Sequence, residues 1–376
     1  MESLQDVPNE AVEALYGGDR QWFDTSEKKF VRFTTLYLPY GDERGGCPDW
    51  RGAWKGADIT KMPCVFCAIP NAVKEYQNTC NNGAVVSHID MCNAFADNLA
   101  RSYRHEPLHT LAIFNGGSFL AMDSLLQQLI IAQVVVSGAR RLVIESRAQL
   151  VSDEAILNIL RELTPHNIKL TVRIGIETQD DRVRAMVLRK GHSRKTLMKA
   201  VEILHAHNVT VGGYALAAPA PLSWIKLVHP YLQQYDAWVL QEAIATIDVI
   251  LDEFAMDEVY FCSTCVAPGT VLEALWQQGE YRPASLSLLA AVLAETVEKH
   301  LKPIHLLPFR DEPAFVAVPS NHMQNGVRQD EALLHEHDIW FREIMDQYRS
   351  TMNAEAFLRK HAALQYNMRD CTLCRI

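Results

Sequence analysis

Three cysteines in the first part of the sequence have the side-chain type and spacing needed to bind a metal. Cys64 and Cys67 form a Cys-x-x-Cys motif, and sixteen residues separate Cys64 from Cys47 upstream. Thiolates are soft ligands, so they restrict the metal to zinc, copper(I) or an iron–sulfur cluster. A structural zinc needs a fourth ligand, which Cys80 or Cys92 can supply. A cube held by three cysteines keeps one iron open for a substrate or cofactor, and the cysteines alone favour neither interpretation.

A second set of cysteines consists of two further Cys-x-x-Cys units. Cys262 and Cys265 follow a strand-like segment, and Cys371 and Cys374 lie near the end of the sequence. If the tail folds back, these four thiols supply a complete ligand set for a structural zinc or an auxiliary iron–sulfur cluster. The alternatives are a redox-active pair, a thiol that donates a hydrogen atom, or inert buried thiols. Cys262 and Cys265 are therefore also candidate catalytic residues.

Candidate cofactor-binding residues stand where three predicted strands end. Two adjacent glycines let a ligand approach the backbone closely, although a plain strand-to-helix turn also explains them. A carboxylate and a guanidinium on one face of an extended segment can bind an amino acid or ribose hydroxyls, with a salt bridge as the alternative. A further glycine permits close packing of a flat ligand, and a glutamate beyond it is placed to accept hydrogen bonds. The candidates are Asn115, Gly116, Gly117, Ser118, Glu145, Arg147, Gly175 and Glu177.

The elements that must position these residues alternate between strand-like and helix-like patterns. Strands separated by helices imply right-handed βαβ units and a parallel sheet. Six such units close part of a barrel, in which functional residues lie at the carboxyl ends of the strands. The expected fold class is α/β, with a partial (βα)6 TIM-like barrel and a C-terminal helical and loop extension. The strand-like segments are 30–37, 110–114, 141–145, 169–177, 209–216 and 258–262.

The expected domains are an N-terminal extension at 1–29, the barrel at 30–301 and a C-terminal extension at 302–376 that packs on the barrel. Within the C-terminal extension, a short strand is expected at 304–309 and a helical tail at 331–361. In the barrel, a helix is expected at 180–188. Its charged residues Asp180, Asp181 and Arg184 are expected to form a solvated helix face.

The composition bounds the class of protein. The chain has 376 residues, of which 48% are hydrophobic and 22% charged, as in ordinary globular proteins. The formal net charge of −9 argues against unspecific phosphate binding as the main activity. No apolar run long enough for a membrane span and no targeting signal are recognised, so a cytoplasmic protein is expected. In a reducing compartment, nine cysteines favour metal ligands or reactive thiols over disulfides.

The order of these features resembles the radical S-adenosylmethionine (radical SAM) enzymes. These have a three-cysteine loop after the first strand, with an aromatic residue such as Phe66 before the last cysteine. A Gly-Gly turn after the second strand and a Gly-Ile-Glu-Thr segment at 175–178 add to the likeness. The runs at 187–193 and 279–283 resemble the Elongator-catalytic-subunit-like branch and, within it, the group of radical SAM subunits of archaeosine synthase. The cysteine spacing is wider than usual, and Ser118 stands where the family has glutamate.

The resemblance implies a cofactor, a reaction and partners. Cys47, Cys64 and Cys67 would hold a [4Fe-4S] cluster whose open iron binds S-adenosylmethionine. An external one-electron reductant of the flavodoxin or ferredoxin type would drive cleavage to a 5′-deoxyadenosyl radical, which abstracts hydrogen from a substrate C–H bond. The implied substrate is a modified tRNA base. The alternatives are a small metabolite, peptide or amino-acid-derived intermediate and, from another class, a zinc-stabilised non-catalytic binding protein.

Overall fold

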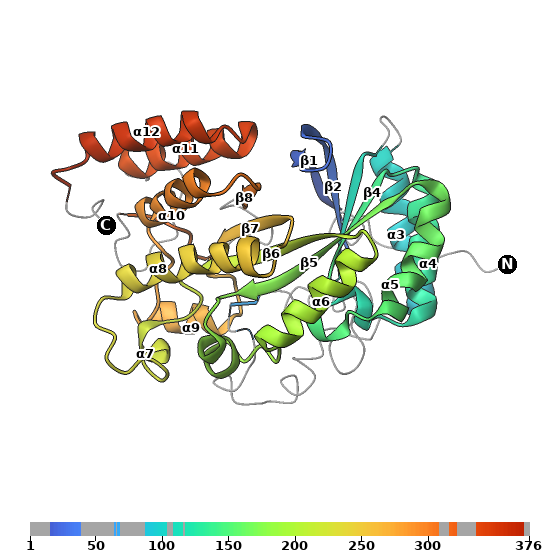
Figure 1. Cartoon of the computed structure of the whole chain (residues 1–376), viewed down its shortest axis with the longest axis horizontal. Coiled ribbons are helices and arrows are strands. Elements are labelled where there is room, and N and C mark those ends of the chain that lie inside the picture. The colour runs from blue at the N-terminus through green and yellow to red at the C-terminus, as the bar shows by residue number, and fades with distance from the viewer. Residues whose placement is uncertain are drawn as a thin grey trace. The chain divides into compact units, whose positions relative to one another are not determined.

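The chain folds as an α/β protein whose strands follow one another in a sheet of order β1 to β8 (Figure 1). The predicted partial TIM-like barrel is confirmed. A computed structural model describes residues 16–38, 64, 66–67, 87–103, 108–115, 117–307, 316–321 and 336–371. The chain divides into a first unit, residues 1–61, 69–174 and 196–211, and a second unit, residues 62–68, 175–195 and 212–376. Each unit is described in turn.

The first unit contains a parallel run of strands with helices packed on it. The inner strands β3 and β4 are almost fully buried, which explains why their central residues are continuously apolar rather than alternating. Helix α5 begins where Ser152 accepts a hydrogen bond from the Ala155 N–H at 3.2 Å. Helix α4 packs between α3 and α5. The elements are β1 (Tyr16–Asp24), β2 (Lys29–Tyr37), α3 (His88–Tyr103), β3 (Thr110–Phe114), α4 (Ser124–Ser137), β4 (Arg141–Glu145), α5 (Asp153–Leu163), most of β5 (Lys169–Glu177) and most of α6 (Arg194–Ala206).

The second unit contains the last strands and the C-terminal helices. Helix α10 packs against α8, α11 and α12, and three consecutive strands pair in parallel. The carboxyl end of β5, residues 175–177, also belongs to this unit. Its elements are the π-helix η6 (Val183–Val187), β6 (Thr210–Ala217), α7 (Leu222–Ile225), α8 (Tyr235–Asp248), the π-helix η7 (Val249–Glu253), β7 (Glu258–Ser263), α9 (Val271–Gln277), α10 (Leu286–Lys299), β8 (Ile304–Leu306), α11 (Glu336–Thr351) and α12 (Ala354–Asn367).

Three local features differ from the sequence-based expectation. Strand β1 was not predicted and pairs antiparallel with β2, with Trp22 opposite Val31. The expected helix at 180–188 is helical from residue 181, but most of it is the π-helix η6 rather than an α-helix. The expected helical tail is two helices, because Met352 adopts a left-handed φ of 51° and Asn353 caps α12 by accepting from the Ala356 N–H at 2.9 Å. The predicted domain boundaries stay predictions.

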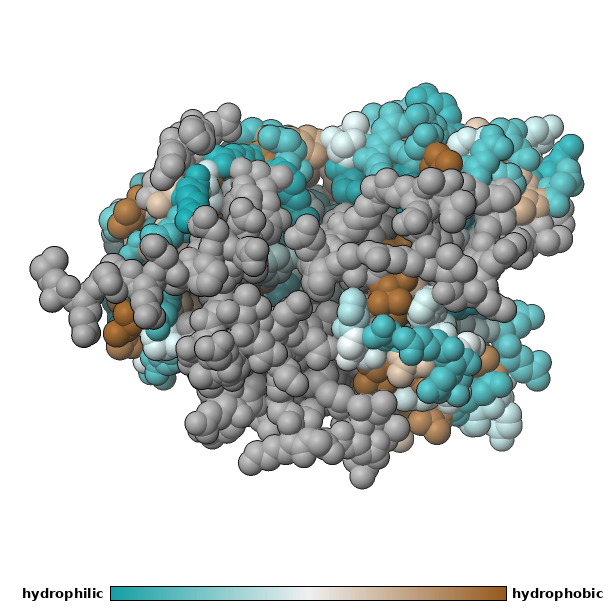
Figure 2. All heavy atoms as spheres, turned by 180° about the vertical axis from the view of Figure 1, so that it is seen from behind, coloured by the Kyte–Doolittle hydropathy of each residue, from teal (hydrophilic) through white to brown (hydrophobic). Residues whose placement is uncertain are grey.

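The described part of the surface is mainly hydrophilic in the view of Figure 2, and hydrophobic residues show singly or in small groups. Scattered exposed apolar side chains are normal for globular proteins. No helix in the described part of the chain is long and apolar enough to cross a bilayer.

Candidate functional site

The two cysteines of the first Cys-x-x-Cys motif lie in one short turn in the second unit. The Cys67 N–H donates to the Cys64 carbonyl at 2.8 Å, and the Cys64 N–H donates to the Leu188 carbonyl at 2.8 Å. Cys64 is buried and Cys67 is half-buried. Cys64 has a φ of 50°, a left-handed conformation that costs energy in a residue other than glycine. The surrounding structure therefore fixes this turn, whereas Cys47 lies outside the described residues.

A buried ion pair lies beside this turn at the carboxyl end of β5. Lys190 Nζ donates to the Glu177 carboxylate and, at 3.1 Å, to the Gly175 carbonyl. The two charged side chains are only 12% and 8% exposed. Burial lowers the pKa of Lys190, but the negative charges of Glu177, Cys64 and Cys67 outweigh it and raise that pKa above its usual value. A buried cation is thus electrostatically coupled to both thiols.

Gly175 leaves room for this ion pair. A Cβ built on Gly175 would collide with Lys190 Nζ and with the Glu177 carboxylate. Glu177 and Arg189 also have left-handed φ angles, 68° and 54°. Strained residues of this kind persist only where the structure around them over-determines the conformation, and they cluster at functional sites.

Arg184 holds the end of β5 in place and corrects one prediction. The expectation of a solvated face is wrong for Arg184, whose side chain is 0% exposed. Its guanidinium donates to the carbonyls of Ile176, at 3.3 Å, and Thr178, and it pairs with Asp181. The buried guanidinium thus supplies a donor to the Thr178 carbonyl, and it shares the Ile176 carbonyl with the Thr178 N–H, which lies 2.9 Å away. No spacing in the sequence distinguishes this arginine from its exposed neighbours.

A buried acid on α8 fixes the segment that follows β5. The Glu242 carboxylate accepts from the Thr178 hydroxyl, from the Asp180 N–H at 3.1 Å and from Gln179 Nε2 at 3.0 Å. Burial raises the pKa of Glu242, against the effect of these hydrogen bonds. Sequence reasoning missed this residue. The available signal was a carboxylate in the middle of a mainly apolar helix.

In the first unit, polar residues meet at the carboxyl ends of β3 and β4. The Ser118 and Ser146 hydroxyls are 2.9 Å apart, and the Arg147 N–H donates to Ser118 Oγ at 3.2 Å. Ser118 therefore ties the two strand ends together, and Ser146 was not predicted. Glu145 is half-buried at the end of β4.

Asn115 is the clearest sign of a ligand in the first unit. It is buried, and neither its side-chain oxygen nor its nitrogen has a hydrogen-bond partner within the described ranges. A buried amide normally has a partner, so a polar ligand fits here. Gly117 is described, and Gly116 lies outside the described residues.

The second cysteine set is only partly described. The Cys262 thiol donates to the Tyr260 carbonyl at 3.5 Å, Cys265 is buried, and Cys371 follows α12. Two groups of three metal-ligating side chains occur among the residues with described positions, and neither contains a cysteine. Cys374 lies outside the described residues, so a second metal stays a prediction.

Tyr281 gives the 279–283 motif a structural role in the second unit. Its hydroxyl lies 2.9 Å from the Ala218 carbonyl and 2.8 Å from the Thr264 carbonyl. Burial raises the pKa of Tyr281 well above its usual range, so the phenol remains a donor. It thereby links the segments that leave β6 and β7.

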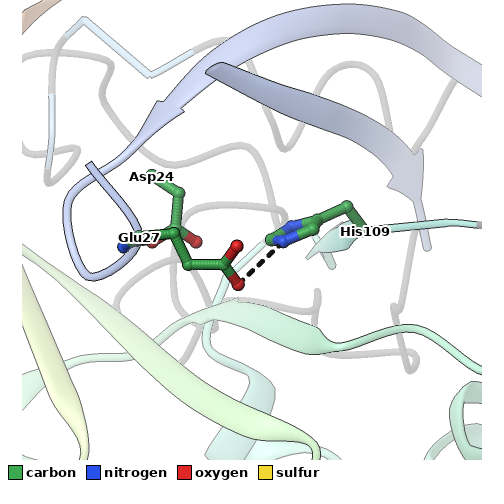
Figure 3. Close-up of side chains that lie close together, drawn as sticks. All are labelled: Asp24, Glu27 and His109. Atoms are coloured by element: carbon green, nitrogen blue, oxygen red, sulfur yellow. Dashed lines mark hydrogen bonds and ion pairs between the residues drawn. The ribbon is translucent and has the colours of Figure 1, made fainter. Parts of the chain in front are cut away.

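Asp24, Glu27 and His109, one of the two groups of potential ligands, lie together in the first unit (Figure 3). His109 Nε2 lies 2.9 Å from the Glu27 carboxylate. Arg141 Nε donates to Asp24 at 2.9 Å, so a guanidinium already neutralises this carboxylate. The group stands near the amino-terminal ends of the strands, where a barrel carries stability rather than catalysis. We interpret it as a structural network.

The residues present fit an iron–sulfur cluster and a polar cofactor. Cys64 and Cys67 are soft ligands on a fixed turn beside a buried cation, which suits a negatively charged thiolate centre. Asn115 supplies a buried amide at a strand end. Together these are the properties expected of residues that bind such groups.

The chain is similar in sequence to two curated proteins of the same name. No family model matches the sequence. The chain is 29% identical over 236 residues to archaeosine synthase subunit beta of Thermococcus kodakarensis, covering 61% of this chain and 65% of the relative. It is 27% identical over 218 residues to the subunit of the same name from Methanosarcina acetivorans, covering 55% of each. The chain thus spans between half and two thirds of the length of these curated relatives.

Two solved structures resemble part of the chain at low sequence identity. Elp3 of the archaeon Methanocaldococcus infernus superposes with a TM-score of 0.46 at 16% identity, covering 68% of this chain and 58% of that chain. SuiB of Streptococcus suis bound to S-adenosylmethionine gives a TM-score of 0.42 at 13% identity, covering 66% and 49%. The chain is thus similar in sequence to archaeosine synthase subunit beta, in agreement with the resemblance that its motifs predicted.

Proposed function

We propose that the protein cleaves S-adenosylmethionine reductively and uses the resulting 5′-deoxyadenosyl radical to abstract hydrogen from a substrate C–H bond. The observation that carries this proposal is the Cys64–Cys67 turn, fixed by the Leu188 carbonyl and coupled to the charge of Lys190. Homology to the archaeosine synthase subunits supports the same chemistry. We expect the reaction in the cytoplasm, where thiols stay reduced.

The predicted cluster ligands and cofactor-binding residues have proposed roles. Cys47, Cys64 and Cys67 would hold a [4Fe-4S] cluster, which would supply one-electron chemistry when reduced by an external reductant of the flavodoxin or ferredoxin type. The cofactor-binding residues hold and orient S-adenosylmethionine through buried amide, hydroxyl and charged groups. They are Asn115, Gly116, Gly117, Ser118, Glu145, Arg147, Gly175 and Glu177.

Two substrate classes follow from different observations. The name of the relatives, archaeosine synthase subunit beta, points to a modified tRNA base. The net charge of −9 instead favours a small metabolite, peptide or amino-acid-derived intermediate. Binding of unmodified tRNA at several salt concentrations separates them, because a tRNA enzyme shows an affinity that falls steeply with salt. Absence of tRNA binding at low salt overturns the first class.

Anaerobic purification tests the radical chemistry. We expect a brown protein with about four irons and four sulfides for one cluster, or about eight if the second cysteine set also binds one. It should release 5′-deoxyadenosine when mixed with dithionite and S-adenosylmethionine. Cys64→Ala and Cys67→Ala should lose both colour and product, whereas Cys92→Ala, which changes a half-buried thiol on α3, should keep them. A colourless protein that contains zinc and no iron would establish the binding-protein alternative.

A further inference from the structure

Lys190, the cation near the carboxyl end of β5, is neither a proposed cluster ligand nor a proposed cofactor-binding residue. Lys190 Nζ is held by two acceptors, the Gly175 carbonyl and the Glu177 carboxylate. An ammonium group carries three N–H donors, and these two bonds use two of them. Removing a lysine ammonium group from water costs free energy. An ion pair with this little exposure is therefore expected to have a role either in packing or in function.

The backbone places this lysine on the segment that anchors the cysteine turn. The Cys64 N–H bonds to the Leu188 carbonyl at 2.8 Å, two residues before Lys190. The Lys190 N–H donates to the Arg184 carbonyl at 2.9 Å, which fixes the start of its side chain. Arg184 in turn holds the carbonyls on either side of Glu177. One network therefore positions the thiols, the cation and its counter-charge.

Charge explains why such a network is useful. Adding an electron to a thiolate-bound cluster increases its negative charge. In a low-dielectric surrounding, a nearby ammonium stabilises that added charge strongly, and a carboxylate opposes it. Groups beyond the direct ligands tune metal centres in this way.

We propose that Lys190 is a positioning residue that raises the reduction potential of the cluster bound by Cys64 and Cys67, and that Glu177 holds Lys190 in place while moderating its charge. This inference rests on the proposed function, because it requires that a cluster binds. It also explains the glycine at position 175, because a Cβ there would displace Lys190 Nζ and the Glu177 carboxylate from their present positions. A salt bridge that serves packing alone would not change the potential in a charge-dependent way.

The test is a reductive titration of the anaerobically reconstituted protein, followed by electron paramagnetic resonance. Lys190→Met keeps the approximate length of the side chain and removes its charge. We therefore expect the ratio of reduced to oxidised cluster at a set potential to fall about tenfold, equivalent to a midpoint about 59 mV lower for one electron. Glu177→Gln should shift the midpoint in the opposite direction. Lys195→Met removes an equal charge from an exposed position on α6 and should leave the midpoint unchanged.

The outcomes separate this inference from the proposed function. Unchanged midpoints in Lys190→Met and Glu177→Gln, or shifts in the same direction, overturn the inference while the cluster still establishes the function. A wild-type protein without iron overturns the function before any variant is compared. If Lys190→Met binds no iron, Lys190→Arg is the second variant, because it keeps the positive charge. Iron binding by Lys190→Arg supports the inference. A folded Lys190→Arg protein that binds no iron overturns it.

Discussion

Two buried ion pairs, Asp24–Arg141 in the first unit and Glu177–Lys190 in the second, have opposite surroundings. Arg141 and Asp24 are 7% and 3% exposed, and Lys190 and Glu177 are 12% and 8% exposed. Arg141 stands at the first residue of β4, whereas Glu177 is the last residue of β5. Burial is therefore similar, and the neighbours of the two pairs differ.

The Asp24–Arg141 pair is saturated with hydrogen bonds. The guanidinium donates to both Asp24 oxygens, at 2.9 and 3.4 Å, and also to Ser26 and, at 3.0 Å, to Thr171. A two-point arginine–carboxylate contact of this kind is rigid and specific. Its surroundings satisfy both charges, which is what a structural pair requires.

The Glu177–Lys190 pair lies among strained residues and beside two cysteines, Cys64 and Cys67. Cys64, Glu177 and Arg189 all have left-handed φ angles, 50°, 68° and 54°. Two ion pairs with similar burial can therefore have different roles. The Asp24–Arg141 pair stabilises the fold, whereas on our proposal the Glu177–Lys190 pair adjusts the properties of a metal centre.

The largest expected effect comes from breaking the saturated pair. Arg141→Met leaves Asp24 buried without its cation, so we expect a loss of about 3–5 kcal/mol in the free energy of unfolding, measured in urea. Arg140→Met removes the same charge from the exposed neighbouring position and should cost less than about 0.5 kcal/mol. Equal losses in the two variants would show that the pair contributes nothing specific.

Gly175→Ala breaks the other pair by steric collision. The added Cβ displaces Lys190 Nζ and the Glu177 carboxylate, and we expect about 1–3 kcal/mol of destabilisation together with loss of bound iron. Gly138→Ala is the control, since Gly138 has a φ of 70° but open space around it. It should cost about 1–2 kcal/mol through backbone strain alone and keep its iron. Normal iron content in Gly175→Ala would separate the ion pair from cluster binding.

The Asp24–Arg141 pair should make the free energy of unfolding depend on pH in the acid range. Burial alone would raise the pKa of Asp24, but the Ser26 hydroxyl and the charge of Arg141 lower it below 3.8. A lowered folded-state pKa stabilises the protein above the unfolded pKa, and this stability is lost as the pH falls through the folded value. The stability difference between wild type and Asp24→Asn should therefore be full above about pH 5 and shrink below about pH 4. Urea unfolding of both proteins measures it, with the exposed Asp97→Asn as a control that should show no such trend.

Local sequence patterns were enough to predict most of the fold. Continuous apolar runs located the parallel strands, since such strands are buried on both faces. Strand β1 was not predicted, because residues 16–24 contain glycines and polar side chains and pair with β2 as a hairpin. The break between α11 and α12 was not predicted either, because it depends on the left-handed backbone conformation of one residue, Met352.

The site was predicted only where chemistry is local in sequence. The spacing of Cys64 and Cys67 indicated a metal-binding turn directly. Lys190 and Glu177 are thirteen residues apart and meet only through the path of a π-helical segment. Glu242 reaches Thr178 from sixty-four residues away. Such pairings depend on the fold as a whole, so composition and spacing could not reveal them.

The smallest expected effect concerns an exposed ion pair, which sets the baseline for the other two. Arg282 and Asp236 are 2.6 Å apart but 59% and 54% exposed. Water and salt screen charges at such a surface, so Arg282→Met should lower the free energy of unfolding by less than about 1 kcal/mol. Moderate salt should remove most of that difference, because the Debye length falls as ionic strength rises. If Arg282→Met instead cost as much as Arg141→Met, and salt left the cost unchanged, burial would not be what distinguishes these pairs, and the contrast between the two strand ends would lose its physical basis.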